Sequence, residues 1–512
     1  MTRFIVANRL SGGGERKAKR EGGDRAEKLL AAHADIRLDN KPESEQARRV
    51  YSVEAPHADM ARMAGELGDD VLVEPEHLRR PAVARPPIVD RVIRAQGVEP
   101  LHPGVGAAFE ITLRSGNQSV AGAKGLLVLN SLTGRVPGTR QEAVSDAGGK
   151  LLFNYDPTQF TPSMIVVEPA SSYWSALQVM PRNGSTIEML GLPKTGPLGW
   201  WHHLVGISES SFKRGQGIRI GIADTGLGPN PYVKHVKALG AVVDGKVDPT
   251  PKATLDQEGH GTHVAGIIGA IPADGSGDYE GIAAGADIGA LRVFGPDGTA
   301  TQGDIALGVD LLSAEFDADL VNLSLGGPEP SAIERDALMA ALELGTLCMA
   351  SAGNSNGAPV YYPAAYPEAA GVNALGLYGM SPAGTLSAAC MPSQPVYFGP
   401  GGLFAANFDA VGYEVGCAAP GVGIISTVPA RPEVAAPYAE MSGTSMACPA
   451  ATAALATFLA ADTYYTGLPR GPERVARAAQ VLAATLRNIG IPNFLAGAGL
   501  VTGRAAPTQP GS

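Results

Sequence analysis

The sequence predicts an α/β fold for residues 200–506, a parallel sheet with helices on both faces, preceded by two smaller units. Short apolar segments alternate there with segments of helical spacing, which is the pattern of a parallel sheet whose strands are joined by helices. Polar residues collect just after the apolar segments, where sheets of this kind build their sites. The patterns of residues 1–83 and 88–185 predict an α+β unit and a β-sandwich-like unit.

The first unit combines strands and helices. RFIVAN, RRVYSVEAP and DVLVEPE are predicted strands, and RAEKLLAAH and ADMARMAGEL between them are predicted helices. The Pro-rich stretch RRPAVARPPIVD, residues 79–90, then interrupts the pattern, because proline punctuates regular structure. We therefore expect this stretch to be a linker.

The second unit contains only strand-like segments. AAFEITLRSG, GLLVLNSL, KLLFNYD, SMIVVEPA and STIEMLG alternate apolar and polar residues, and Gly, Asn, Asp and Pro separate them. No helical period appears between residues 88 and 185. This pattern is typical of a small β-sandwich.

The third unit alternates strands and helices along its length. IRIGIADTG, DIGALRVF, DLVNLSLGG and TLCMASAGN are predicted strands, the first ending at Asp224 and the last at Asn354. THVAGIIGAI, DIALGVDLLSAEF and AIERDALMAALELG are predicted helices between them, and a long apolar helix follows the glycine turn before Ser445.

Composition narrows the function classes. The 512 residues carry a formal net charge of -10 at pH 7, so bulk attraction to nucleic acid is not expected. No apolar run has the length that a membrane span needs, so no membrane partner is expected. The N-terminus does not resemble a secretory signal, because its apolar run is short and no small-residue cleavage site follows. We expect a cytoplasmic protein, with export by another route or a misassigned start left open.

The four cysteines fit no zinc or redox spacing. Cys348 and Cys448 are predicted to be buried free thiols, since one lies in a strand-like segment and the other in the apolar helix. Cys390 and Cys417 flank a loop and could pair, although nothing in the sequence requires it.

Several candidate site residues have more than one interpretation. Asp224 in IADTG could belong to an aspartic protease. Such a site needs two facing carboxylates, however, and no second D-T-G or D-S-G occurs in the sequence. Asp224 could instead orient a histidine or cap a turn. His260 and His263 are spaced like metal ligands, yet no third ligand accompanies them, so no metal site is predicted. Ser445 could cap the helix or act as a nucleophile at its start.

Together these residues form an ordered Asp, His, Ser set, each in a Gly-rich turn at the edge of an α/β sheet. The region from 200 to 506 resembles the catalytic domain of subtilisin-like serine proteases. Four motifs carry the resemblance, IADTGLG, HGTHVAG, SAGNS and SGTSMACP, and they occur in the family's order with LVNLSLGG and AAPGVGIIST between them. One such motif is weak, whereas four in order are specific.

The resemblance implies the catalytic roles. Ser445 would attack the peptide carbonyl, and His260 would take its proton and deliver it to the leaving amine. Asp224 would hold the imidazole's tautomer. Asn354 and the Ser445 backbone N–H would stabilise the oxyanion. No cofactor is required for this chemistry.

The resemblance also implies where the substrate binds. LVNLSLGG, with Ser324, Leu325 and Gly326, and RVFGPDG, with Gly295, match the two segments that line the family's cleft, where the peptide pairs as an added strand. Ser355 and Tyr361 would form walls of the main side-chain pocket. Because a tyrosine fills pocket volume and neither wall carries an acid, we expect a preference for small or medium uncharged residues before the scissile bond.

The chain departs from the family's pattern in places. Ala450 stands where relatives have histidine after the proline of the serine motif, and a Gly/Pro-rich segment, residues 377–401, is inserted where it could rim the cleft. The loop PADGSGDYEG stands where relatives often bind calcium; Asp274 and Asp278 are suitable ligands, but the loop does not match cleanly, so structural calcium is only a possibility. Residues 1–83 resemble, more weakly, the family's inhibitory propeptide.

We therefore expect a serine endopeptidase that acts on peptides or proteins, with its own N-terminal domain as intramolecular inhibitor and an accessory β domain. A dedicated processing protease for one peptide or partner protein is the alternative. A catalytically dead binding protein on the same fold is the third possibility, against which the complete set of site residues argues.

Overall fold

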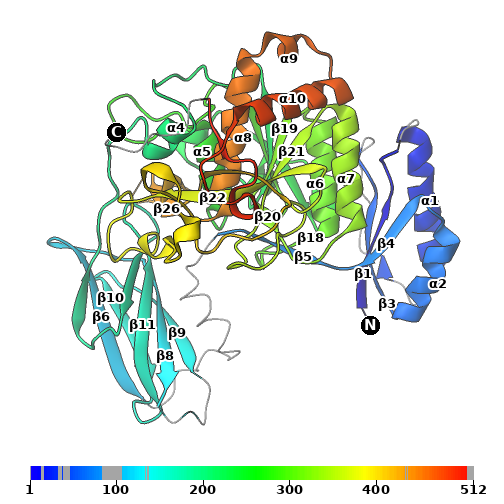
Figure 1. Ribbon diagram of the computed structural model, residues 1–512. Coiled ribbons are helices and arrows are strands. Elements are labelled where there is room, and N and C mark those ends of the chain that lie inside the picture. Colours follow the sequence, from blue (N-terminus) through cyan, green and yellow to red (C-terminus); the bar gives the residue numbers. More distant parts are fainter. Residues whose placement is uncertain are drawn as a thin grey trace.

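The chain folds into three units, as Figure 1 shows. The N-terminal unit (blue) lies at the right, a β unit (cyan) at the lower left, and the rest of the chain forms the large central unit. This computed structural model describes residues 2–12, 16–32, 37–38, 47–83, 106–132, 134, 138–432, 434 and 436–503. The predicted linker beyond residue 83, the start of the predicted second unit up to residue 105, and residues 504–506 lie outside the described residues.

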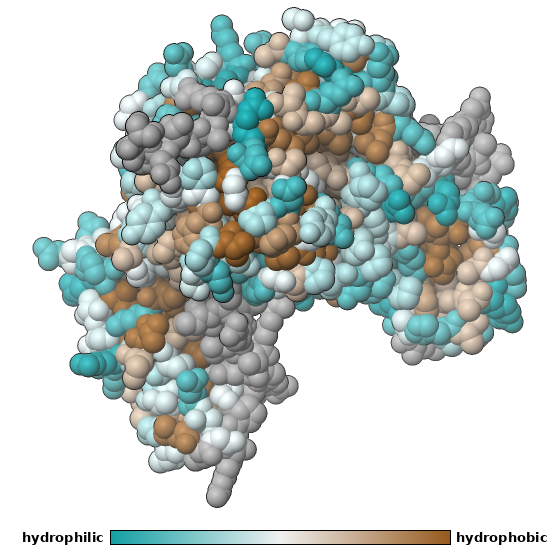
Figure 2. Space-filling model, in the orientation of Figure 1, coloured by the Kyte–Doolittle hydropathy of each residue, from teal (hydrophilic) through white to brown (hydrophobic). Residues whose placement is uncertain are grey.

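The N-terminal unit is an antiparallel sheet with two helices packed on it. The sheet has the order β2-β3-β1-β4. Phe4, Tyr51 and Met60 are buried in its core, and hydrophilic residues lie along its outer edge in Figure 2. The predicted strands and helices are confirmed; only the two-residue β2 was missed, since it is too short to show a pattern. The elements are β1 (Thr2–Asn8), α1 (Arg16–Ala32), β2 (Arg37–Leu38), β3 (Val50–Ala55), α2 (His57–Leu67) and β4 (Val71–Pro75).

The second unit is a β-sandwich, as the alternation predicted. One sheet has the order β10-β6-β13 with β7 paired to β6, and the other has the order β12-β11-β8-β9. Phe109, Leu127 and Ile165 are buried between the two sheets. The strands are β6 (Ala107–Ser115), β7 (Gln118–Ser119), β8 (Lys124–Ser131), β9 (Thr139–Val144), β10 (Lys150–Tyr155), β11 (Phe160–Glu168), β12 (Ala176–Val179) and β13 (Ser185–Glu188).

The central unit is built on one large, mostly parallel sheet. Its strand order is β16-β15-β17-β14-β19-β21-β22-β24-β28-β27, and β23 pairs with β22. The pairings from β15 to β28 are parallel, whereas β16, β23 and β27 pair antiparallel. The strands are β14 (Arg219–Asp224), β15 (Lys237–Val243), β16 (Lys246–Asp248), β17 (Asp287–Arg292), β19 (Leu320–Leu323), β21 (Leu347–Ser351), β22 (Ala369–Leu377), β23 (Leu403–Ala405), β24 (Val415–Pro420), β27 (Leu486–Arg487) and β28 (Leu500–Val501).

Helices cover both faces of this sheet, so the predicted α/β class is confirmed. α5 (His260–Gly269) and α8 (Thr444–Ala461) pack on one face, and α6 (Gln302–Ala314) and α7 (Ala332–Leu344) on the other. The remaining elements are α4 (Trp200–Leu204), α9 (Thr463–Gly467), α10 (Pro472–Thr485), α11 (Asn493–Ala496), β18 (Ala300–Thr301), β20 (Leu325–Gly326), β25 (Ile424–Thr427) and β26 (Tyr438–Met441), with the 3-10 turns Pro231–Val233, Pro251–Thr254, Ala388–Cys390, Pro395–Tyr397 and Pro400–Gly402.

The apolar helix α8 is the central helix of the core. Among the described residues it is the one helix long and apolar enough to cross a membrane. No apolar run of that length was identified in the sequence. Of its residues, 78% are buried inside the protein, and the helix contacts β19, β21, β22 and β24. A helix that is apolar all round and packed in this way is a core helix.

Buried ion pairs attach the N-terminal unit to α6 and α7. The Arg48 guanidinium donates to Asp310 at 2.7 Å and to Asp336 at 3.1 Å, and all three side chains are buried. Arg79 donates to both oxygens of Glu334, at 2.8 and 2.7 Å. Paired guanidinium and carboxylate groups offset part of each other's burial cost, whereas either one alone would be strongly destabilising.

The residues after β4 extend into the central unit as a strand. The sequence predicted a linker from residue 79, but Leu78–Pro81 form β5, which lies between β18 and β20 in a three-stranded antiparallel sheet. Local pattern cannot reveal such a strand, because its pairing partners lie more than 200 positions later in the chain.

The β-sandwich is hydrogen-bonded to the inserted segment, residues 377–401, and to β26. Backbone bonds run from the Leu386 N–H to the Ser175 carbonyl (2.8 Å), from the Leu177 N–H to the Gly384 carbonyl (2.9 Å) and from the Ser172 N–H to the Tyr438 carbonyl (2.8 Å). The side chain of Leu386 also packs against apolar residues of β8 and β11. The sandwich therefore packs directly against the inserted segment and β26 of the central unit.

Candidate active site

Asp224 and His260 meet where β14 ends and α5 begins. Asp224 is the last residue of β14, and its Oδ1 lies 2.6 Å from Nδ1 of His260. Oδ1 also accepts from the Thr225 N–H at 2.7 Å, so the turn-capping and histidine-orienting interpretations both apply. Both partners are buried, with 0% and 3% of their surface exposed.

The environment of His260 sets its charge. Burial alone would lower its pKa, but the negative charge of Asp224 and their hydrogen bond, with the fields of Asp256 and Glu258, raise the pKa above the ordinary value of 6.5. Its other nitrogen, Nε2, is buried and has no hydrogen-bond partner among the described residues. Nε2 is therefore free to accept a proton.

Ser445 lies in the first turn of α8 and does not cap it. The N-cap position belongs to Gly443, so the capping interpretation is excluded. The Ser445 hydroxyl donates to the backbone carbonyl of Ser324 at 2.8 Å. The hydroxyl is therefore not hydrogen-bonded to Nε2 of His260, which has no partner among the described residues.

A backbone carbonyl of the chain itself lies between the two predicted oxyanion donors. The Asn354 side chain donates from Nδ2 to the carbonyl oxygen of Ala82 at 2.5 Å, and the Ser445 N–H points at the same oxygen at 3.4 Å. Asn354 follows β21, and its Oδ1 accepts from the N–H and hydroxyl of Thr444, both at 3.0 Å, which orients the amide.

The residues before Ala82 lie in a cleft as an added strand. In β5, Pro81 and Arg80 pair with Leu325 and Gly326 of β20, and the Ala82 N–H donates to the Ser324 carbonyl at 3.3 Å. Three of the predicted substrate-binding residues, Ser324, Leu325 and Gly326, therefore contact this segment.

The opposite side of the cleft is β18, which the sequence analysis did not identify. Ala300 and Thr301 pair with Arg79 and Leu78. The predicted Gly295 lies in the preceding turn, where its N–H donates to the Thr299 carbonyl at 2.8 Å, and it does not pair with β5. A strand of two residues has no periodicity. Only its pairing with β5 reveals it, and that pairing is not visible in the sequence.

Tyr361 fills the space beside two glycines, Gly353 and Gly326. A Cβ atom on Gly353 would lie 2.6 Å from Cδ2 of Tyr361, and one on Gly326 would lie 3.1 Å from its Cβ. The predicted Ser355 takes no part in this packing, because its hydroxyl donates to the Ala358 carbonyl within its own turn at 2.6 Å.

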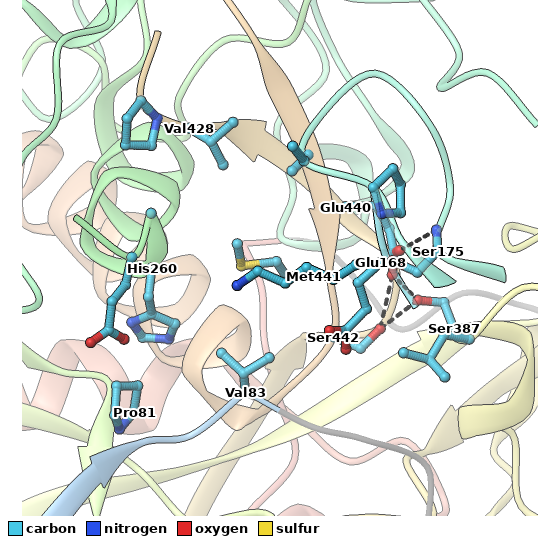
Figure 3. Close-up of a pocket in the computed structure, with 18 of the residues that line it drawn as sticks. Pro81, Val83, Glu168, Ser175, His260, Ser387, Val428, Glu440, Met441 and Ser442 are labelled. Atoms are coloured by element: carbon cyan, nitrogen blue, oxygen red, sulfur yellow. Dashed lines mark hydrogen bonds between the residues drawn. The ribbon is translucent and has the colours of Figure 1, made fainter. Parts of the chain in front are cut away.

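A cavity of about 710 Å³ opens beside His260 on the other side of Ala82. Figure 3 shows Val83 at its centre, His260 on one side and Glu440, Ser175 and Ser387 on the other. The inserted segment contributes Ser387 to the lining and therefore does rim the cleft.

Two of the side chains that were candidates for metal binding, His263 and Asp278, are bonded to other groups of the protein. Nε2 of His263 donates to the Ala439 carbonyl at 3.1 Å, and burial lowers the pKa of this histidine to about 3. In the loop PADGSGDYEG, the Asp278 carboxylate lies 3.3 Å from the Lys194 ammonium and accepts from the Tyr232 hydroxyl at 3.2 Å. Calcium needs six to eight oxygen ligands, and the described residues form no group of three or more metal-binding side chains. This loop does not fit a calcium site.

All four cysteines are buried free thiols. Cys390 donates to the Leu386 carbonyl and Cys417 to the Gly371 carbonyl, so the two that could have paired are not bonded to each other. Burial raises the pKa of Cys348 and Cys417 to about 12. Ala450 is buried inside α8, where its small side chain packs in the core.

Comparison with known proteins identifies relatives of the central unit. Residues 215–499 match the subtilase family. Subtilisin BL of Lederbergia lenta is 32% identical over 235 residues, 46% of this chain and 73% of the relative. Subtilisin DY of Bacillus licheniformis is 29% identical over 297 residues, 57% of this chain and 92% of the relative.

A solved structure shows the same fold. Fervidolysin from Fervidobacterium pennivorans, described as a keratinolytic enzyme related to subtilisin, superposes with a TM-score of 0.57 at 19% identity. The match covers 99% of this chain and 62% of the fervidolysin chain.

Proposed function

The chain belongs to the subtilase family and is a serine-type endopeptidase. From that premise we propose that Asp224, His260 and Ser445 cleave peptide bonds through an acyl-enzyme intermediate. We further propose that the first bond cleaved is its own Ala82–Val83 bond. One observation carries both: the Ala82 carbonyl oxygen lies between the Asn354 amide and the Ser445 N–H. Hydrogen-bond donors held in place around that oxygen stabilise the charge that develops on it.

The proposed reaction follows from the positions of these groups. Ser445 turns from the Ser324 carbonyl to His260, transfers its proton to Nε2 and attacks the carbonyl carbon. Collapse of the tetrahedral intermediate breaks the C–N bond, and His260 gives the proton to the departing amine. Water, activated by the same imidazole, then releases the acyl group. Asp224 stabilises the imidazolium in both steps.

The same contacts support intramolecular inhibition by the N-terminal unit. Residues 78–82 occupy the strand position that a substrate would take, and the buried Arg48 and Arg79 ion pairs hold the unit on α6 and α7. The Glu74 carboxylate accepts from the Ser331 hydroxyl at 2.7 Å at the N-terminus of α7, where a negative charge is favourable. After cleavage the unit would remain bound and cover the cleft until it dissociates or is degraded.

Self-cleavage is expected to produce a mature chain that begins at Val83. Ala82 is the residue whose carbonyl lies at the two donors, and its side chain is 7% exposed, so no neighbouring bond is equally placed. N-terminal sequencing and intact mass of the purified wild type measure this directly. A mature N-terminus elsewhere between residues 80 and 90, or a chain that stays intact under assay conditions, would contradict the assignment.

Tyr361 is expected to restrict the residue before the scissile bond to small side chains. The ring fills the space beside Gly353 and Gly326, and the chain's own residue at that position is alanine. Tyr361→Gly should shift the preference toward Phe and Leu by roughly 10–200-fold, the range that methylene-sized differences in an apolar pocket supply. Paired peptide substrates with Ala or Phe before the scissile bond give the ratio of kcat/KM.

A matched control separates pocket shape from a general loss of tyrosine. Tyr413 is 86% exposed, and Tyr413→Gly should leave the Ala to Phe ratio unchanged. An unchanged ratio in Tyr361→Gly, or a wild type that already favours Phe, would mean that Tyr361 does not shape the pocket.

The alternative, a dedicated processing protease, is favoured by the second wall that the β-sandwich adds beside the site, because a narrower cleft admits fewer substrates. Digestion of a mixed proteome distinguishes the two: many cleavages indicate a general endopeptidase, and almost none indicate a dedicated one. Labelling of Ser445 by a fluorophosphonate tests the third possibility, a catalytically dead binding protein.

A further inference from the structure

The cavity beside His260 is enclosed by three separate parts of the chain. The β-sandwich contributes Lys124 and Glu168, the inserted segment contributes Leu386 and Ser387, and β26 contributes Glu440. Figure 3 shows Glu440, Ser175 and Ser387 together at the end of the cavity opposite His260. The sandwich is therefore one wall of this cavity.

The course of the chain places the first residue after the scissile bond in this cavity, which Arg80 and Pro81 before the bond also line. Residues 78–81 lie between β18 and β20, on the side that receives the residues before that bond. Val83, which follows it, lines the cavity and is 45% exposed there. A substrate that follows the same course places its next residues along the cavity, about 3.3 Å of chain per residue.

Glu440 is the buried charged group of the cavity wall apart from His260. Its residue is 8% exposed, and its carboxylate accepts hydrogen bonds from the Ser387 hydroxyl, from the Ser442 hydroxyl at 3.4 Å and from the Ser175 N–H at 3.5 Å. Among the described residues no Lys or Arg forms an ion pair with it, and burial raises its pKa. A cation bound beside this carboxyl group would favour its charged form and so oppose the rise in pKa that burial causes.

The other charges around the cavity leave it negative once the N-terminal unit has gone. Glu168 and Glu258 line it in addition to Glu440, against Lys124 and Arg431, and all but Glu440 are at least partly exposed. Burial and the charges of Asp256 and Asp224 raise the pKa of Glu258, and the fields of His260 and Lys124 only partly oppose that shift. Arg80, the remaining cation of the lining, belongs to the segment that self-cleavage removes.

We propose that this cavity is a specificity pocket for a Lys or Arg side chain within the first three residues after the scissile bond, with the Glu440 carboxylate as its ion-pair partner. The inference rests on the proposed function, because it needs a peptide in the cleft. The chain's own sequence fits it: Arg85 is the third residue after the Ala82–Val83 bond, although it lies outside the described residues. A charge-assisted bond to a buried carboxylate is stronger than the same bond in water.

The test uses mature enzyme and quenched peptides with Ala before the scissile bond. One set carries Lys in turn at the first, second and third positions after it, and a matched set carries norleucine, which has a similar length without the charge. We expect kcat/KM for Lys to exceed that for norleucine about tenfold or more at one of these positions, equivalent to one charge-assisted contact. In Glu440→Gln this ratio should fall to near one.

The ratio within each variant separates recognition from structure. If Glu440 only holds the sandwich and the inserted segment together, Glu440→Gln will change both peptides equally. The exposed Glu142 serves as matched control, and Glu142→Gln should keep the wild-type ratio. A wild type without any preference for Lys overturns the proposal, whether or not Glu440→Gln folds. A short Ala-nitroanilide, which has no residues after the scissile bond, reports the proposed function alone: if it is not hydrolysed, the protease assignment fails, whereas hydrolysis without a Lys preference refutes only this inference.

Discussion

Ser445→Ala is expected to fold and to lose peptide hydrolysis, with turnover falling by about 10⁶, the magnitude known for the same loss in subtilisin, a member of this family. The substitution removes the only atom that can form the acyl bond. It also removes one hydrogen bond, from the hydroxyl to the Ser324 carbonyl, which costs about 1 kcal/mol of stability. The variant should keep its N-terminus, because the Ala82–Val83 bond is no longer cut.

Activity on peptide substrates, intact mass and thermal unfolding measure the three expectations for Ser445→Ala. Thr457→Ala is the matched control, since it deletes a hydroxyl on the same helix that bonds only the Ala454 carbonyl. A Ser445→Ala protein that retains activity within about tenfold would refute the nucleophile, because such a loss is far below what a missing nucleophile causes.

Asp224→Asn is expected to lower turnover by about 10⁴ with little change in the fold, as the equivalent change does in a serine protease of another fold. The asparagine can present an N–H to Nδ1 of His260, which favours the tautomer whose Nε2 already carries a proton. That tautomer cannot accept the proton of Ser445. The 2.6 Å contact between Asp224 and His260 is the interaction at stake.

The pH profile adds a readout that a purely structural defect would not move. His260 must be neutral to act as a base, so activity falls as the pH drops through its pKa, which Asp224 raises. Removing that negative charge lowers the pKa, and the residual activity of Asp224→Asn should persist to lower pH than that of the wild type. Asp156→Asn, at a half-buried turn residue of the β-sandwich, is the control and should leave both rate and profile unchanged. A profile that shifts the other way would refute the role of Asp224.

Local pattern was sufficient for most elements of the fold. The alternation in residues 107–188 predicted β6, β8, β10, β11 and β13 but not β7, β9 or β12, and the helical spacing of α5, α6 and α7 matched their observed positions. These signals are local because a strand or a helix repeats its apolar residues every few positions. Elements without a repeat were missed: β2 and β18 have two residues each, and β5 ends at Pro81, in the proline-rich stretch that suggested a linker.

The motifs around Asp224, His260, Asn354 and Ser445 could be found in the sequence because each lies in a short Gly-rich turn with a fixed composition. The tertiary structure then corrected parts of the site. Ala300 and Thr301, rather than Gly295, pair with β5, and Ser355 bonds within its own turn. Glu440 carried no signal at all, because its neighbours Ser387 and Ser175 come from distant segments.

The sequence by itself determined the α/β class and the family, and it predicted four residues for the catalytic chemistry. Only the tertiary structure decided that Ala82 lies at Ser445, that Tyr361 packs beside Gly353 and Gly326, and that the β-sandwich lines the cavity that contains Val83. The physical reason is the range of the interactions. Turns and amphipathic periods are encoded by neighbouring residues, whereas the position of Ala82 at Asn354 depends on contacts between residues 272 positions apart in the chain.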